Sequence, residues 1–241
     1  RLKMETTCDM KKYAENWVNK KFILYIKNII HSFFIRCFLL TLFLFPLNAN
    51  ADNQDPDTQQ KAREFIESFA ERAISIINNK DLTESEYLGE YRSILNETFA
   101  INYLARISLS RHRKKASKEE LLIYYSLFPE FILKVNSSRL RKLDTKKIVI
   151  EKITPHAKLD IFIRTKAYNS ENKSLDIDWR VRSDKDGDIK IIDVKIEGIS
   201  MVATQRDDFT ARITSSGVNG LNQYMKNIID GFKFANTTVT P

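Results

Sequence analysis

The sequence has few of the residues that metal sites and thiol chemistry require. Its 241 residues include two cysteines and three histidines. Both cysteines, Cys8 and Cys37, precede Asp52, so a product that begins at Asp52 has no thiol. A disulfide framework, a Cys-ligated zinc and a cysteine nucleophile are then excluded. His112 and His156 have no second His at ligand spacing, so we expect surface histidines and no metal.

Motifs for catalysis or cofactor binding are also missing. The sequence has no Gly-x-Ser-x-Gly, no phosphate-binding glycine loop and no dinucleotide fingerprint. Asp184, Asp186 and Asp188 resemble the start of a calcium loop, but glycine is fourth rather than sixth, and the closing glutamate is absent. We therefore interpret this segment as a hairpin turn. Asp176 and Asp178 alternate with apolar residues, which places them on the solvent face of a strand. We expect neither an enzyme nor a cofactor.

The positive charge is concentrated near the start of the sequence. Six glycines and five prolines are typical of a folded protein, and the formal net charge is +8. Residues 1–51 hold eight Lys and Arg against three acids, a net of +5, which leaves +3 for the remainder. A nucleic-acid binder needs a concentrated basic surface. The nearly balanced remainder therefore argues against a nucleic-acid partner.

Residues 1–51 have the layout of a secretory signal. Scattered lysines precede an apolar run over residues 37–47, and Ala49-Asn50-Ala51 follows it. We predict cleavage after Ala51 and export to the periplasm. An uncleaved anchor is the alternative, although Arg36 interrupts the longer apolar span and a charge is costly inside a bilayer.

The remaining residues, 52–241, are expected to form one α+β domain. Helical periodicity and capping signals predict four helices in the first half. Their expected positions are Asp55-Pro56 to about Asn79, Thr83 to about Leu95, Phe99 to Ile107, and Ser117 to about Val135. Pro129 falls inside the last of these, where we expect a kink.

The apolar period changes from 3.6 to 2 after about Lys146. Alternating residues predict strands around Ile148–Ile150, Leu159–Ile163, Leu175–Val181 and Ile189–Glu197, joined as an antiparallel meander. The apolar phase slips near Ile192, which indicates a β-bulge or a strand buried on both faces. Two helices, near Thr204–Ile213 and Asn219–Phe234, should follow, with Gly217 and Gly220 at their joint.

Three pieces of sequence near the C-terminus resemble the signature of the MlaC family, also called the toluene-tolerance family. They are Glu197-Gly198-Ile199-Ser200-Met201, then Arg206 with Phe209, then Gly217-Val218-Asn219-Gly220-Leu221. In the family these positions read Glu-Gly-Val-Ser, Arg-x-x-Phe and Gly-x-x-Gly-Leu. The resemblance covers roughly residues 56–234. A neighbouring branch associated with hopanoid metabolism is also similar.

This resemblance implies a periplasmic phospholipid carrier. Its sheet would be of the nuclear transport factor 2-like type, and the helices would enclose an apolar cavity for acyl chains. The implied role is shuttling of phospholipid between outer and inner membranes and maintenance of outer membrane lipid asymmetry. The implied partners are an inner-membrane ABC transporter with a lipid-binding ring and an outer-membrane lipoprotein complex. A hopanoid-associated lipid-binding protein and an enzyme on the same fold type are the alternatives.

The side chains expected to line the cavity are those that the sequence pattern places on the inward faces of the strands and helices. Periodicity does not distinguish a filled core from one left partly open for a ligand. The candidates are Leu159, Ile161, Ile163, Ile177, Trp179 and Val181 from the sheet, with Phe99, Tyr125, Phe128, Phe131 and Met201 opposite them.

One basic run remains outside this interpretation. Arg111-His112-Arg113-Lys114-Lys115 should form a loop between two helices. It is either an ordinary solvated loop or a surface that meets anionic head groups or an acidic partner.

Overall fold

The computed structural model describes the chain from Pro56 to Thr237, with side chains as far as Gly231. The predicted signal segment and its predicted cleavage site lie outside these residues. The elements of the first half are α2 (Pro56–Asn78), α3 (Glu84–Thr98), α4 (Ile101–Leu109), the 3₁₀ helix η1 (Ser110–Lys114) and α5 (Lys118–Leu140). The elements of the second half are β1 (Lys147–His156), β2 (Asp160–Tyr168), β3 (Ser174–Ser183), β4 (Ile189–Ile196), β5 (Ile199–Ser200) and α6 (Met201–Thr237).

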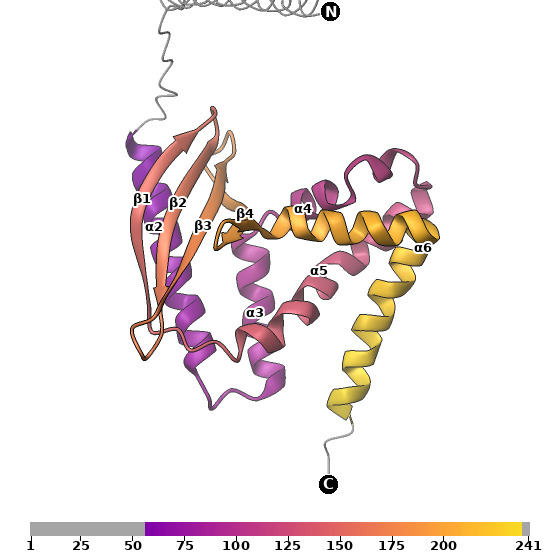
Figure 1. Cartoon of the computed structure of the whole chain (residues 1–241), viewed down its shortest axis with the longest axis horizontal. Coiled ribbons are helices and arrows are strands. Elements are labelled where there is room, and N and C mark those ends of the chain that lie inside the picture. Colours follow the sequence, from indigo (N-terminus) through magenta and orange to yellow (C-terminus); the bar gives the residue numbers. More distant parts are fainter. Residues whose placement is uncertain (1–55, 238–241) are drawn as a thin grey trace, which may run out of the picture. The chain divides into compact units, whose positions relative to one another are not determined.

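The α+β class and the antiparallel meander are confirmed. The five strands are paired in sequence order, β1-β2-β3-β4-β5, and every pairing is antiparallel. Helix α2 lies along one face of the sheet, while α4, α5 and α6 lie to one side of it (Figure 1). Helix α3 stands between these groups. The apolar sides of β1 to β4 are packed toward α2, as their alternation predicts.

Two capping boxes begin α3 and α5, as expected. The Thr83 hydroxyl accepts the Glu86 N–H, and the Glu86 carboxylate accepts the Thr83 N–H. Ser117 and Glu120 repeat this arrangement at the start of α5. Each box satisfies two backbone donors that a helix start leaves unpaired. These local contacts explain why both helix starts could be read from the sequence.

The slip in apolar phase on β4 is a β-bulge. Arg180 is paired with Asp193 and Val181 with Ile191, so Ile192 is an extra residue on β4. Ile191 and Ile192 are consequently both buried, at 0% and 3% exposure. A bulge inserts one residue and turns the strand, which lets two adjacent side chains face inward.

Helix α6 consists of two helical segments joined at Gly217, as predicted. Gly217 has φ 72° and ψ −179°, a conformation that a residue with a β-carbon rarely adopts. The second segment turns back along α5 (Figure 1). The N–H₂ group of Asn222 donates to the Glu120 carbonyl at 2.9 Å, which fastens this segment to the start of α5.

Three details differ from the expectation. Helix α5 ends at Leu140 rather than near Val135, and Pro129 lies inside it. The expected basic loop contains the 3₁₀ helix η1, which the mixed sequence did not reveal. Strand β5 is two residues long, too short to show an alternation.

Candidate functional site

The apolar face of the sheet forms one cluster with α2. Ile161, Ile163, Trp179 and Val181 are buried there, and Ile177 is packed against them, so the inward phase expected for these five residues is confirmed. The other buried members are Ala62, Ile66 and Ile191. This packing buries the apolar side of the sheet against α2.

Trp179 is held in place by a short polar chain inside this cluster. Its indole N–H donates to the Thr165 hydroxyl at 3.0 Å, and that hydroxyl donates to the Ile177 carbonyl at 3.0 Å. Phe69 of α2 lies edge-on between the Trp179 ring, at 5.2 Å, and the Phe99 ring, at 5.9 Å. A buried indole N–H that is paired stabilises one orientation of the ring. Trp179 is therefore held in one orientation.

The expected residues of α5 belong to a different cluster. Phe128 and Phe131 are buried against Phe209 of α6, with Tyr125 partly buried beside them. The hydroxyl of fully buried Tyr124 donates to the Ala105 carbonyl at 2.9 Å, and burial raises the pKa of this tyrosine. Most of the candidate residues are thus divided between a sheet cluster and a helical cluster.

Two candidates are exposed rather than buried. Leu159 lies in the turn before β2 and is 43% exposed, because β2 begins only at Asp160. Met201 is the first residue of α6 and is 38% exposed. The alternating pattern was extended one residue past the strand in the first case. Met201 was expected to face the sheet, but the first residue of a helix at the surface is exposed.

An open depression lies where the apolar clusters meet. It has a volume of about 400 Å³ and lies at the junction of α3 and α4, against Pro129 of α5. Its lining residues are Asn96, Phe99, Ala100, Ile101, Asn102, Tyr103 and Pro129. We call this depression the seam. Phe99 is the member of the expected set that lines it.

Phe99 and Ile101 connect the seam to the surrounding cores. Phe99 is packed against the sheet cluster and against a third cluster formed around α3, whereas Ile101 is packed against the helical and α3 clusters. The Ala100 N–H donates to the Ile191 carbonyl at 3.0 Å, which ties the junction to β4. Separation of the sheet from the helices at this point would expose apolar side chains on both sides.

Two arginines flank Tyr103, a residue that lines the seam. The guanidinium of Arg106 lies 5.2 Å from the centre of the Tyr103 ring, and that of Arg182 lies 5.0 Å from it. Arg106 follows Tyr103 by three residues on α4, so the two share a face. Arg182 comes from β3. None of these three residues is among the predicted site residues, although the Tyr-x-x-Arg spacing on an amphipathic helix is a visible signal.

Arg182 is also bound to a buried carboxylate. Asp160, whose side chain is 3% exposed, accepts hydrogen bonds from Arg180 and from Arg182. Burial raises the pKa of Asp160, but the hydrogen bonds from the two arginines and their charges outweigh it, so the pKa is lowered overall. Asp160 thus stays ionised and fixes Arg182 beside Tyr103.

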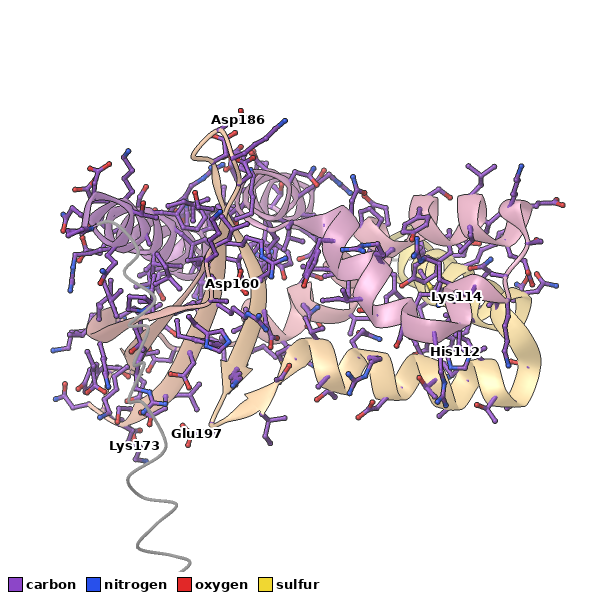
Figure 2. All side chains as sticks on the ribbon, turned by 90° about the horizontal axis from the view of Figure 1, so that it is seen from above. His112, Lys114, Asp160, Lys173, Asp186 and Glu197 are labelled. Atoms are coloured by element: carbon purple, nitrogen blue, oxygen red, sulfur yellow. The ribbon has the colours of Figure 1, made fainter. Side chains whose placement is uncertain are left out.

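The hairpin between β3 and β4 is formed as expected. The Asp184 carboxylate accepts the N–H groups of Asp186 and Asp188 at 2.9 Å, and Gly187 has φ 89°. Asp186 lies at the tip of the turn (Figure 2). Within residues 56–237, no group of three His, Cys, Asp or Glu side chains is arranged to hold a metal.

Comparison with known proteins identifies both a family and a fold. A family model described as MlaC protein matches residues 67–227. A solved structure of a phospholipid-binding protein from Ralstonia solanacearum, in complex with a phospholipid, matches with a TM-score of 0.60 at 16% identity. The match covers 70% of this chain and 97% of that one. No curated protein matches the chain significantly.

Proposed function

Since the chain belongs to the MlaC protein family, we propose that it is an exported phospholipid carrier. Residues 52–241 would form the mature periplasmic protein after removal of residues 1–51. The observation that supports this proposal most directly is the seam, an open depression lined by both apolar and polar side chains, with two arginines stacked on its residue Tyr103. The fold shared with a phospholipid-binding protein is consistent with it.

The chemistry of the seam suits an anionic amphiphile. We propose that an acyl chain enters past Phe99 and Ile101, while the phosphate stays near the exposed Arg106. A volume of about 400 Å³ is at the small end for ligand pockets, so a complete phospholipid requires the seam to widen. Separation of the sheet cluster from the helical cluster would provide that space. The Trp179 ring would keep its orientation.

The energetics favour exchange rather than storage. Each buried CH₂ group contributes about 0.8 kcal/mol, so a chain of about 16 carbons gains roughly 12 kcal/mol on burial. Removal of the same chain from a bilayer costs a similar amount, because the bilayer interior is equally apolar. A carrier therefore exchanges lipid with little net bias. We propose that direction comes from an inner-membrane ABC transporter and an outer-membrane lipoprotein complex.

Native mass spectrometry of the periplasmic protein tests this proposal. We expect a mass that includes phospholipid, and extraction of the sample should identify the lipid. A hopanoid in its place would indicate the neighbouring branch of the family. A folded protein that carries no lipid and takes none from vesicles would contradict the carrier proposal.

A variant with the seam filled locates the lipid. Ala100→Trp adds a large ring at the seam and should reduce the lipid-bound fraction roughly tenfold, equivalent to about 1.4 kcal/mol of lost affinity. Glu71→Trp adds the same ring on the exposed side of α2 and is the matched control. Thermal unfolding of both variants must be measured, since a strained core also releases lipid. Equal lipid content in two folded variants would place the lipid elsewhere.

A further inference from the structure

The segment between α4 and α5 carries a cluster of positive charge that the structure leaves exposed. Arg111, Arg113, Lys114, Lys115 and Lys118 all have exposed side chains. We call residues 111–118 the basic segment. None of these five cations forms an ion pair with a carboxylate among the side chains that the structure describes.

Two large apolar side chains are exposed near the start of α5, separated from the basic segment by residues 119–121, of which Glu119 is exposed. Leu122 is 73% exposed and Ile123 is 41% exposed, both within the first two turns of α5. Lys118 and Leu122 are four residues apart, so they share one face of the helix. A single exposed leucine needs no explanation. Two adjacent apolar side chains beside five exposed cations form an amphiphilic surface.

Helix α5, which carries this surface, is packed against α4 and α6 on its opposite side. Buried Tyr124 and Phe128 of α5 are packed against α4 and α6, and the Asn222 side chain donates to the Glu120 carbonyl. The Ala116 N–H also donates to the His112 carbonyl at 3.2 Å, which closes the turn between η1 and α5. The exposed side chains therefore project from a fixed backbone. Binding through them would require little ordering of the chain.

We propose that this amphiphilic surface docks onto an anionic lipid bilayer. Cations on the basic segment would bind head-group phosphates, and Leu122 and Ile123 would enter the boundary between head groups and acyl chains. An acidic protein partner is less well matched, since protein interfaces concentrate energy in Trp, Tyr and Arg, and leucine is under-represented there. This inference deepens the proposed function, because a lipid carrier must reach a membrane surface.

The docking surface is well separated from the far end of the sheet. Figure 2 places His112 and Lys114 at one end of the described domain and Glu197 and Lys173 at the other. Lys142, Lys152, Lys158 and Lys185 are exposed outside the basic segment, so they provide a charge-matched control. Ile199, near Glu197 and 61% exposed, provides an apolar control for Leu122.

Co-sedimentation with vesicles tests the docking surface. The probes are vesicles of phosphatidylglycerol mixed with phosphatidylcholine, compared with pure phosphatidylcholine, at low and high salt. We expect the wild type to bind the anionic vesicles and to be released by salt, which screens exposed charge. Replacement of Arg111, Arg113, Lys114 and Lys115 with Gln should weaken binding at least roughly tenfold. The same change at Lys142, Lys152, Lys158 and Lys185 should leave at least half of the binding.

The apolar part of the surface has its own test. Leu122→Gln should weaken binding roughly fivefold, even at a salt concentration that screens the cations, whereas Ile199→Gln should not. Equal vesicle binding by wild type, the Arg111/Arg113/Lys114/Lys115 variant and Leu122→Gln would overturn the docking proposal. Strong binding of the wild type to an acidic protein but not to vesicles would also overturn it.

Lipid content separates this proposal from the proposed function. Native mass spectrometry of the Arg111/Arg113/Lys114/Lys115 variant should show the same bound lipid as the wild type, because these residues do not line the seam. Unchanged lipid content with unchanged vesicle binding would refute docking and leave the carrier proposal standing. A wild type without lipid that still binds anionic vesicles through this surface would refute only the carrier proposal.

Discussion

Positive charge is arranged differently on the sheet and on the basic segment. On the face of the sheet turned away from α2, Arg164 is paired with Asp178, Lys166 with Glu151, and both Arg180 and Arg182 with Asp160. On the basic segment, five exposed cations lie without such partners among the described side chains. The first arrangement stabilises strand pairing, whereas the second leaves its charge available to another molecule. The number of cations alone would not have distinguished the two surfaces.

The largest effect on stability should come from loss of Asp160, the carboxylate that binds both Arg180 and Arg182. Asp160→Asn should lower the free energy of unfolding by about 2–3 kcal/mol, because it leaves two guanidinium groups without their shared carboxylate. The loss is smaller than for a fully buried pair because Arg180 and Arg182 are about one-third exposed. Chemical denaturation measures it. Asp178→Asn, whose partner Arg164 is 54% exposed, is the control and should cost less than about 1 kcal/mol.

Acidification should remove the contribution that the Asp160 carboxylate makes to stability. The lowered pKa of Asp160 means that its contribution to stability is present above the ordinary value of 3.8 and is lost as pH falls through the folded-state pKa. The free energy of unfolding of the wild type should therefore fall more steeply below about pH 4 than that of Asp160→Asn. Denaturation curves measured at several pH values below about 5 give the slope of the free energy of unfolding against pH for each protein. Parallel slopes would show that the two arginines do not hold the carboxylate ionised. Asp186→Asn, at the exposed hairpin tip (Figure 2), controls for the change in net charge.

The smallest effect on stability should come from the basic segment. Replacement of Arg111, Arg113, Lys114 and Lys115 with Gln should change the free energy of unfolding by less than about 0.5 kcal/mol, because these side chains are exposed and unpaired among the described residues. Thermal or chemical unfolding measures this difference. A loss comparable to that of Asp160→Asn would mean that these cations support the fold, and the contrast between the two surfaces would disappear.

The elements that could be predicted from the sequence are those with local causes. Capping boxes at Thr83 and Ser117, period-2 alternation in the strands and Gly217 in the middle of α6 each act within a few residues. The bulge at Ile192 was also visible, because an extra residue changes the phase of the pattern. Short-range signals of this kind are sufficient for element type and approximate position.

The candidate site was harder to predict because it depends on pairing and packing. Asp160 meets Arg182 through the register of β2 and β3, which places these residues directly opposite each other. The seam depends on how the α3–α4 junction meets Pro129, a contact between segments distant in sequence. Alternation identified the inward face that includes Trp179. It did not show that the sheet and helical clusters are separate.

The bend at Gly217 also has a consequence for the order of folding. Neighbouring strands of the sheet are adjacent in sequence, so each hairpin closes a short loop. The helical cluster requires the segment beyond Gly217, and the Asn222–Glu120 contact joins residues 102 positions apart. Contacts between such distant residues form late because the entropy of the intervening chain must first be lost. The sheet is therefore expected to assemble first, and the aromatic helical core is completed when the last helix folds back.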